Sequence, residues 1–146
     1  MTGDLLKCSA LATRTIANVS ESLAEKLGLR PEFRSIGILT ADSDDVTYCA
    51  LDEATKTAAV EVVYGRSLYA GAGNASTKLA GEVIGILAGP NPAEVESGLR
   101  ACADFMESGV GFRSANEDDS IVYFAHTVSR TGSYLSKVAG VTSSVW

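Results

Sequence analysis

The feature that most restricts the fold of this chain is a pair of apolar segments separated by a loop of small residues. Residues 60–64 and 80–88 are apolar enough to form buried strands, and the second segment is almost continuously apolar, which is typical of a central strand. The predicted loop between them, residues 65–76, has roughly a dozen residues, too many for a tight hairpin turn, which has about two to five. The loop is rich in glycine and alanine, so we predict that it lies on a surface or around an opening.

The composition is that of one globular domain, or of one domain and part of another. The 146 residues are 46% hydrophobic and 21% charged, which argues against a disordered chain. The net charge of −6 argues against nucleic acid and membrane surfaces as partners, because both favour clusters of Lys and Arg. The sequence predicts neither a membrane span nor a signal peptide. Three unpaired cysteines, Cys8, Cys49 and Cys102, are interpreted as buried small hydrophobes of a cytoplasmic protein.

Strand and helix patterns alternate along the chain. Residues 7–17 and 35–40 are predicted as two further strands. A capping pattern at residues 18–21 begins a short helix that Gly28 and Pro31 end, and the carboxylates of residues 42–45 begin a second helix that continues to about Ala58. The pattern predicts an α/β fold, an α+β sandwich whose mixed sheet is flanked by helices.

The clearest helix follows the last of these strands. Asn91 is its predicted cap, Pro92 its first residue, Glu94 stands three residues after the cap, and Gly109 is placed to end it. Its predicted buried stripe consists of Val95, Leu99, Cys102 and Met106.

A weak internal repeat divides the chain. Residues 12–20 are echoed by residues 127–134, both with the order strand, Arg-Thr and short amphipathic helix. We therefore predict a first domain over residues 1–115 and the start of a second copy over residues 116–146. This short second part cannot bury a core alone, so it should dock on the first domain, pair with another chain or fray.

Few residues have the spacing of a catalytic or metal site. His126 lies in a strand pattern and is interpreted as structural, and residues 71–73 lack the third glycine of a dinucleotide-binding motif. Asp42 and Asp44 resemble the Asp-x-Asp motif of haloacid-dehalogenase-type phosphatases, but the later acidic pair, residues 118–119, precedes a strand instead of following one. We expect no catalytic residue, cofactor or metal; the alternatives are a Mg²⁺-dependent phosphohydrolase using Asp42 and Asp44, and a small-ligand regulatory domain.

Long contiguous segments resemble one family. Residues 38–48, 51–56, 61–71 and 81–94 are similar to the tandem-domain bacterial microcompartment shell proteins of ethanolamine utilisation (the EutL family), and residues 129–136 are similar to the opening of that family's second domain. The resemblance implies a permuted bacterial microcompartment (BMC) domain with a mixed, mainly antiparallel sheet. It also implies a non-enzymatic protein of which three chains form a pseudohexameric tile in the microcompartment shell, with pores that pass small metabolites.

The same resemblance implies two sets of pore residues. The first set would border the central pore of the trimer: Arg66, Ser67, Tyr69, Gly71, Gly73, Asn74 and Ser76. The second set would line a smaller pore within each subunit: Asp44, Asp45, Glu82 and Phe112. Converging carboxylates in a narrow opening favour an ammonium ion, so a cationic amine such as ethanolamine is the expected ligand. The implied partners are two further copies of the chain and other shell proteins, with cobalamin as a further candidate.

Overall fold

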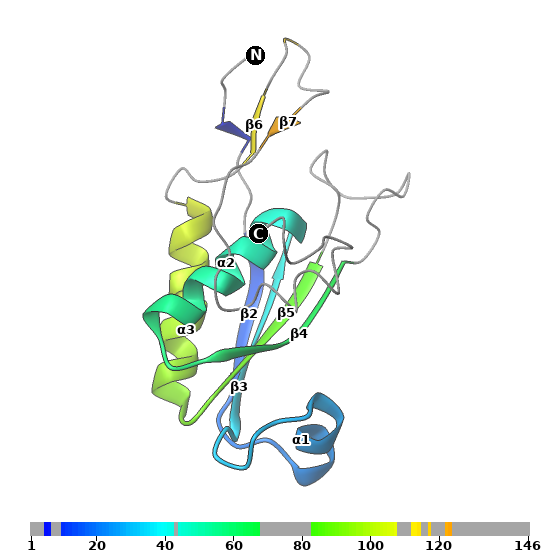
Figure 1. Cartoon of the computed structure of the whole chain (residues 1–146), viewed down its shortest axis with the longest axis vertical. Coiled ribbons are helices and arrows are strands. Elements are labelled where there is room, and N and C mark those ends of the chain that lie inside the picture. The colour runs from blue at the N-terminus through cyan, green and yellow to red at the C-terminus, as the bar shows by residue number, and fades with distance from the viewer. Residues whose placement is uncertain are drawn as a thin grey trace, which may run out of the picture.

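The computed structural model describes residues 5–6, 10–42, 44–67, 83–107, 112–114, 117 and 122–123. In chain order its elements are β1 (Leu5–Leu6), β2 (Ala10–Ile16), α1 (Glu21–Leu27), β3 (Ser35–Ala41), α2 (Asp44–Thr57), β4 (Glu61–Ser67), β5 (Val83–Gly89), α3 (Pro92–Glu107), β6 (Phe112–Ser114) and β7 (Val122–Tyr123) (Figure 1). The four strands and three helices predicted up to residue 109 are confirmed, with ends that differ by a few residues.

The main sheet has the strand order β2-β3-β5-β4. The predicted central strand is confirmed, since β5 pairs with β3 on one side and with β4 on the other. Every pair in this sheet is antiparallel, which agrees with the mainly antiparallel sheet predicted above. Although β3 and β4 run in the same direction and are joined through α2, β5 inserts between them and separates what would otherwise be a parallel pair.

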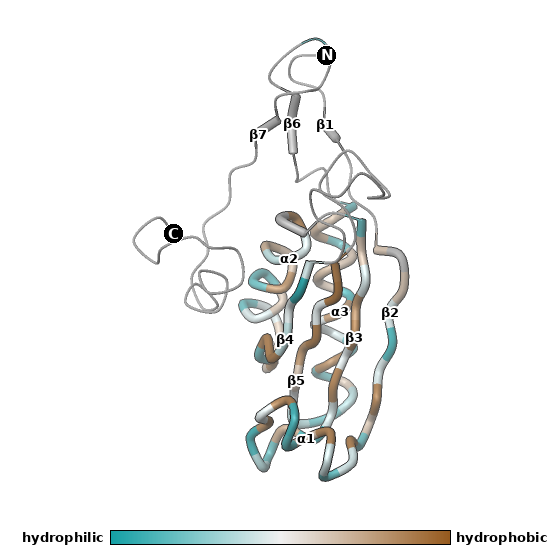
Figure 2. The backbone as a smooth tube through the Cα atoms, turned by 90° about the vertical axis from the view of Figure 1, so that its right-hand side faces the viewer, coloured by the Kyte–Doolittle hydropathy of each residue, from teal (hydrophilic) through white to brown (hydrophobic). Residues whose placement is uncertain are grey.

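Helices α2 and α3 cover one face of this sheet (Figures 1 and 2). Two strand glycines allow their close approach: a Cβ atom added to Gly37 would lie 2.7 Å from Val95 of α3, and one added to Gly85 would lie 2.7 Å from Leu51 of α2. The largest fully buried side chains of the core between these elements are Leu39, Val46, Leu51, Val83, Leu87, Val95 and Met106. The predicted stripe of α3 is therefore confirmed as its buried face.

Helix α1 and the segment after it cover one end of the opposite face. The Ser20 hydroxyl accepts a hydrogen bond from the Leu23 amide, and Gly28 ends the helix in the left-handed conformation with φ 64°. A second apolar cluster forms here around Val19, Ile36, Ile86 and Ala88. The capping pattern read from the sequence is thus confirmed at both ends of α1.

Helix α3 begins as predicted, with one difference in the role of Glu94. The Asn91 side chain accepts a 2.9 Å hydrogen bond from the Glu94 amide, which is the expected cap. The Glu94 carboxylate accepts a 2.8 Å hydrogen bond from the Ala59 amide. Glu94 therefore joins the start of α3 to the turn that follows α2.

A second, small sheet has the order β1-β6-β7. Its strand β7 pairs antiparallel with β6, with Arg113 opposite Tyr123. This pairing joins a strand of the predicted first domain to a strand beyond residue 115, and the domain division itself stays a prediction. None of the described helices is both long and apolar enough to cross a membrane.

Candidate functional site

Several of the predicted pore positions are connected to one end of the main sheet. Ala41 at the end of β3 is opposite Val83 at the start of β5, and Val83 is opposite Ser67 at the end of β4. The three residues form a row across adjacent strands. The chain enters α2, enters β5 and leaves β4 at this row, which we call the loop end of the sheet.

Asp44 and Asp45 are the first two residues of α2, directly beyond the loop end. Acidic residues in a first turn are favoured by the partial positive charge of the helix N-terminus, which accounts for their position without any ligand. The helix that carries them is firmly held, because every residue from Val46 to Asp52 is buried. The structure gives the backbone of Asp44 and Asp45, and their side chains lie outside what it describes.

The predicted long loop is flanked by residues that pair with each other, and the structure places its first predicted residues, Arg66 and Ser67, in strand β4. Arg66 is opposite Ile84, and Ser67 is opposite Val83, so strand pairing fixes both bases of the loop. Arg66 is exposed and Ser67 is half-buried. The remaining predicted pore residues lie outside the described residues: Tyr69, Gly71, Gly73, Asn74, Ser76 and Glu82. Glu82 directly precedes Val83 in the chain, which connects it to the loop end.

Phe112 belongs to a different sheet from the other candidates. It is the first residue of β6 and pairs with Leu6 of β1. In the view of Figure 1 the small sheet lies beyond the loop end and not beyond the end that carries α1. The backbone therefore brings Phe112 to the same end of the molecule as α2's start, without placing its side chain.

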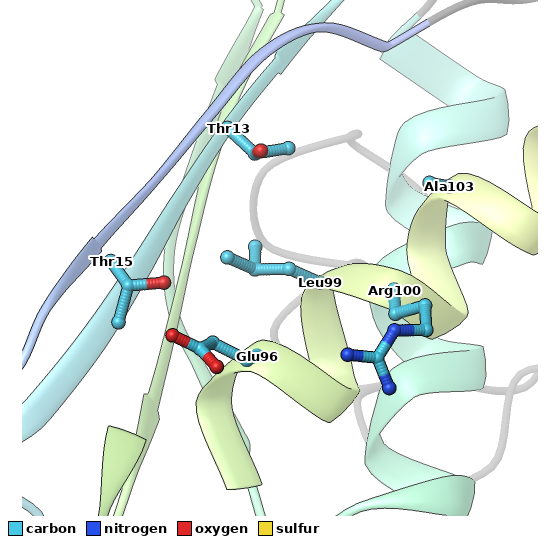
Figure 3. A pocket seen from close by; sticks show the side chains of 6 residues that line it. All are labelled: Thr13, Thr15, Glu96, Leu99, Arg100 and Ala103. Atoms are coloured by element: carbon cyan, nitrogen blue, oxygen red, sulfur yellow. The ribbon is translucent and has the colours of Figure 1, made fainter. Parts of the chain in front are cut away.

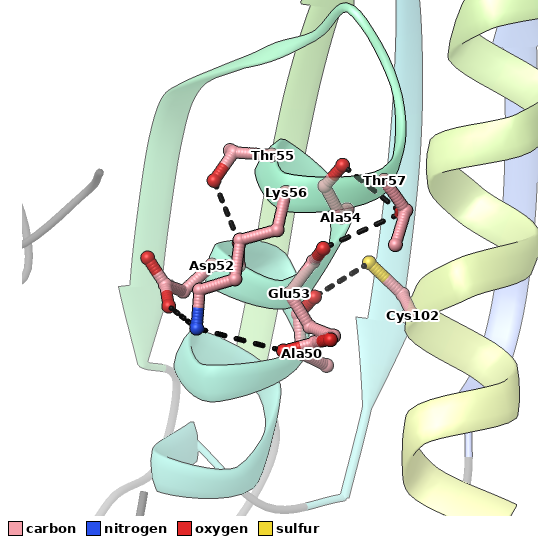
Figure 4. Close-up of polar contacts among 8 residues, drawn as sticks. All are labelled: Ala50, Asp52, Glu53, Ala54, Thr55, Lys56, Thr57 and Cys102. Carbon is pink, nitrogen blue, oxygen red and sulfur yellow. Dashed lines mark hydrogen bonds and ion pairs between the residues drawn. The ribbon is translucent and has the colours of Figure 1, made fainter. Parts of the chain in front are cut away.

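A buried ion pair in α2 was not predicted from the sequence. The Asp52 side chain is fully buried, and the ammonium of Lys56, whose side chain is 30% exposed, lies 3.1 Å from the Asp52 carboxylate (Figure 4). The same ammonium lies 3.6 Å from Glu53. The spacing of Asp52 and Lys56, four residues apart, was a visible signal, but it does not tell whether a pair is buried.

Helix α2 is also tied to α3. The Cys102 thiol donates a 3.4 Å hydrogen bond to the Ala50 carbonyl, and burial raises the pKa of this thiol from 9.0 to about 12. A thiol with so high a pKa is a poor nucleophile at neutral pH. The interpretation of Cys49 and Cys102 as buried small residues is confirmed, and Cys8 lies outside the described residues.

Of the two residues of the phosphohydrolase alternative, the structure describes the side chain of Asp42, which is half-buried after the end of β3. The side chain of Asp44 and residues 118–119 lie outside what it describes, as does His126, which was predicted to be structural. Among the residues whose side chains are described, no three of the His, Cys, Asp and Glu side chains are grouped so that they could hold a metal ion.

The described part of the chain is thus an antiparallel four-stranded sheet with two helices on one face. Residues 35–115, more than half of the chain, match the family described as BMC domain. The chain belongs to this family.

Within this family the chain is similar to EutL proteins. It is 68% identical over 141 residues to the bacterial microcompartment shell protein EutL of Clostridium perfringens. The aligned residues make up 97% of this chain and 65% of that protein. Against EutL of Salmonella typhimurium the identity is 56% over 138 residues, with 94% and 63% covered. The crystal structure of the ethanolamine utilization protein EutL from Leptotrichia buccalis superimposes with a TM-score of 0.81 at 66% identity, over 97% of this chain and 65% of that one.

These comparisons confirm the resemblance to the EutL family, and the pore residues stay a prediction. The chain spans slightly less than two thirds of the length of the relatives it matches.

Proposed function

We propose that the chain is a structural, non-catalytic shell protein of an ethanolamine-utilisation bacterial microcompartment in the cytoplasm. Three copies would form a pseudohexameric tile whose pores pass small metabolites. The observation that carries the proposal is 68% identity to a microcompartment shell protein EutL over 97% of this chain. About a third of that relative's own length lies outside the match.

The arrangement of the loop end supports a pore at the long loop. Pairing of Ser67 with Val83 holds both bases of the loop at adjacent strands, so the segment between them leaves and re-enters the sheet at the loop end. A loop rich in glycine and alanine needs little core of its own and tolerates several backbone conformations. Such a loop suits the rim of an opening that three copies share.

The same end of the sheet supports a site for a small amine. Asp44 and Asp45 follow β3, and Glu82 precedes β5, its neighbour in the sheet. Because paired strands lie about 4.8 Å apart, carboxylates attached to the ends of two neighbouring strands are within reach of one small cation. Ethanolamine carries one ammonium group, and its size suits such a site.

The oligomeric state of the chain in solution tests the proposal that three copies form a tile. Sedimentation velocity and light scattering over a range of protein concentrations should give a trimer or a larger ring, since a pore on a threefold axis needs three copies. A strictly monomeric chain at high concentration would contradict the proposal.

Calorimetric titration with ethanolamine tests the amine site separately. Asp45→Asn and Glu82→Gln should each weaken binding about tenfold or more, because a hydrogen bond to a charged group contributes about 1.5–3 kcal/mol. Glu107→Gln, an exposed carboxylate at the end of α3, is the matched control. Unchanged affinity in Asp45→Asn and Glu82→Gln would contradict the proposed amine site, and it would not affect the proposal that three copies form a tile.

A further inference from the structure

An open cleft of about 240 Å³ lies between the edge strand β2 and helix α3 (Figure 3). Thr13 and Thr15 line it from the strand, and Glu96, Leu99, Arg100 and Ala103 line it from the helix. Within the described residues, β2 pairs with β3 on one side and with no strand on the other. The cleft is therefore bordered by one strand edge that is open to pairing and by one face of a helix, outside the loop end described above.

The spacing of the lining residues suits an extended polypeptide. Glu96 and Arg100 are separated by four residues of helix, a rise of about 6 Å. Side chains on one face of a strand repeat every two residues, about 6.6 Å apart. Alternate side chains of a strand added beside β2 would therefore meet Glu96 and Arg100 in turn. Addition of a strand to an exposed sheet edge is a general mode of peptide recognition.

The charges of the cleft are available to a partner. Glu96 and Arg100 have the i,i+4 spacing of a helical ion pair, yet no ion pair joins them in the structure. Figure 3 shows the Glu96 carboxylate directed toward Thr15 at one end of the cleft. The side chain of Leu99 is directed from α3 toward β2 and gives the cleft an apolar lining. A partner strand should then carry a basic side chain near Glu96 and an acidic one near Arg100.

Arg14 argues against a second copy of this chain as that partner. It lies between Thr13 and Thr15 in β2, so its side chain is on the opposite face of the strand, and it is exposed. In an antiparallel pair of two β2 strands centred on the cleft, Arg14 would be opposite Arg14, and like charges directly opposite each other are destabilising. An acidic residue of a different segment at this place would be favourable.

We propose that the cleft binds an extended segment of another polypeptide with the charge order basic, acidic, acidic. The basic side chain meets Glu96, the following acidic one meets Arg14 on the outer face, and the second acidic one meets Arg100. The strand runs antiparallel to β2, the direction whose pairing is slightly more stable. The inference is independent of the pores at the loop end.

The test uses a capped heptapeptide, acetyl-Thr-Val-Lys-Asp-Glu-Val-Thr-amide, added to the ¹⁵N-labelled full chain. Amide shifts should change in β2 and α3 and saturate with a Kd below about 1 mM. A peptide of the same composition with Glu-Lys-Asp at its centre places Lys opposite Arg14, and it should bind at least about fivefold more weakly, as expected for the loss of about 1 kcal/mol of charge pairing. Equal binding of the two peptides would overturn the proposal.

A charge exchange checks the placement of the peptide. Glu96→Lys should weaken the first peptide about fivefold, and a peptide with Glu in place of its Lys should restore the affinity. Asp104→Lys changes an exposed charge of α3 outside the cleft and is the matched control. An equal loss in both variants, or shifts of β2 that grow with protein concentration alone, would contradict the proposal, the second by showing that a further copy fills the cleft. Sedimentation of Glu96→Lys reports tile formation separately.

Discussion

Lys56 makes two ion pairs whose carboxylates differ in burial, and this difference predicts how much each pair contributes to the free energy of unfolding. Its partner Asp52 is fully buried, whereas Glu53 is 35% exposed. Lys56→Met would leave the Asp52 carboxylate without this cation in the interior, and we expect a loss of about 1–3 kcal/mol in the free energy of unfolding. Glu53→Gln should cost at most about 0.5 kcal/mol, because an exposed pair contributes little. Urea denaturation measures both, and similar losses would show that burial of Asp52 does not decide the cost.

Cys102 predicts how stability depends on alkaline pH. Its pKa is about 12 in the folded chain against an ordinary value of 9.0, so the unfolded thiol loses its proton first as the pH rises. Between these two values the unfolded state binds fewer protons, and the free energy of unfolding should fall with pH, by about 1 kcal/mol from pH 9 to pH 10. Below pH 9 this contribution is constant. Urea denaturation at each pH measures this fall, which should be about 1 kcal/mol smaller in Cys102→Ala than in the unchanged chain between pH 9 and pH 10. An equal fall in both proteins would show that the Cys102 thiol is not its source.

At the scale of elements, the close approach of α2 to the sheet predicts the effect of a methyl group at Gly85. An added Cβ would lie 2.7 Å from Leu51, which is 1% exposed and has little room to move. Gly85→Ala should therefore destabilise the chain by about 1–3 kcal/mol through overpacking. Thermal unfolding followed by circular dichroism measures the loss.

Gly28 provides the matched comparison, because it separates backbone strain from lack of space. Its φ is +64°, and a Cβ would meet nothing within 4 Å. Gly28→Ala should cost about 1 kcal/mol from the left-handed conformation alone, and Gly28→Asn should cost less, since asparagine adopts that conformation more readily. If asparagine at residue 28 were as costly as alanine, strain at the end of α1 would not be the cause.

Local signals were sufficient to predict the four strands of the main sheet and the three helices, because caps and apolar periodicity are properties of neighbouring residues, but they did not indicate the short strands β1 and β6. Asn91 and Gly28 were recognised in this way, and both act as predicted. The Glu94 hydrogen bond to Ala59 joins residues far apart in the sequence, so no local pattern could indicate it. The burial of Asp52 and the cleft beside Thr13 likewise depend on which elements pack together.

At the scale of the whole molecule, the strand order explains why the candidate site was only partly predictable. Apolarity indicated that β5 is central, but the insertion of β5 between β3 and β4 is a non-local pairing. That pairing brings Ala41, Val83 and Ser67 into one row and so connects the acidic start of α2 to the bases of the long loop. The pore residues themselves came from family resemblance, since the spacing of the carboxylates alone also fitted a phosphohydrolase.

The predicted division of the chain at residue 115 leads to a prediction for the whole fold. A chain that ends at residue 115 loses β7 and its pairing with β6, but it retains α2, α3 and all four strands of the main sheet. Because the core lies between that sheet and the two helices, we expect this shorter chain to keep its helical circular dichroism and a single cooperative unfolding transition. Hydrogen exchange should show protection of β3 and β5 close to that in the full chain, with the loss confined to β6 and β1. Loss of cooperative unfolding would mean that residues 116–146 complete the first domain and do not begin a second one.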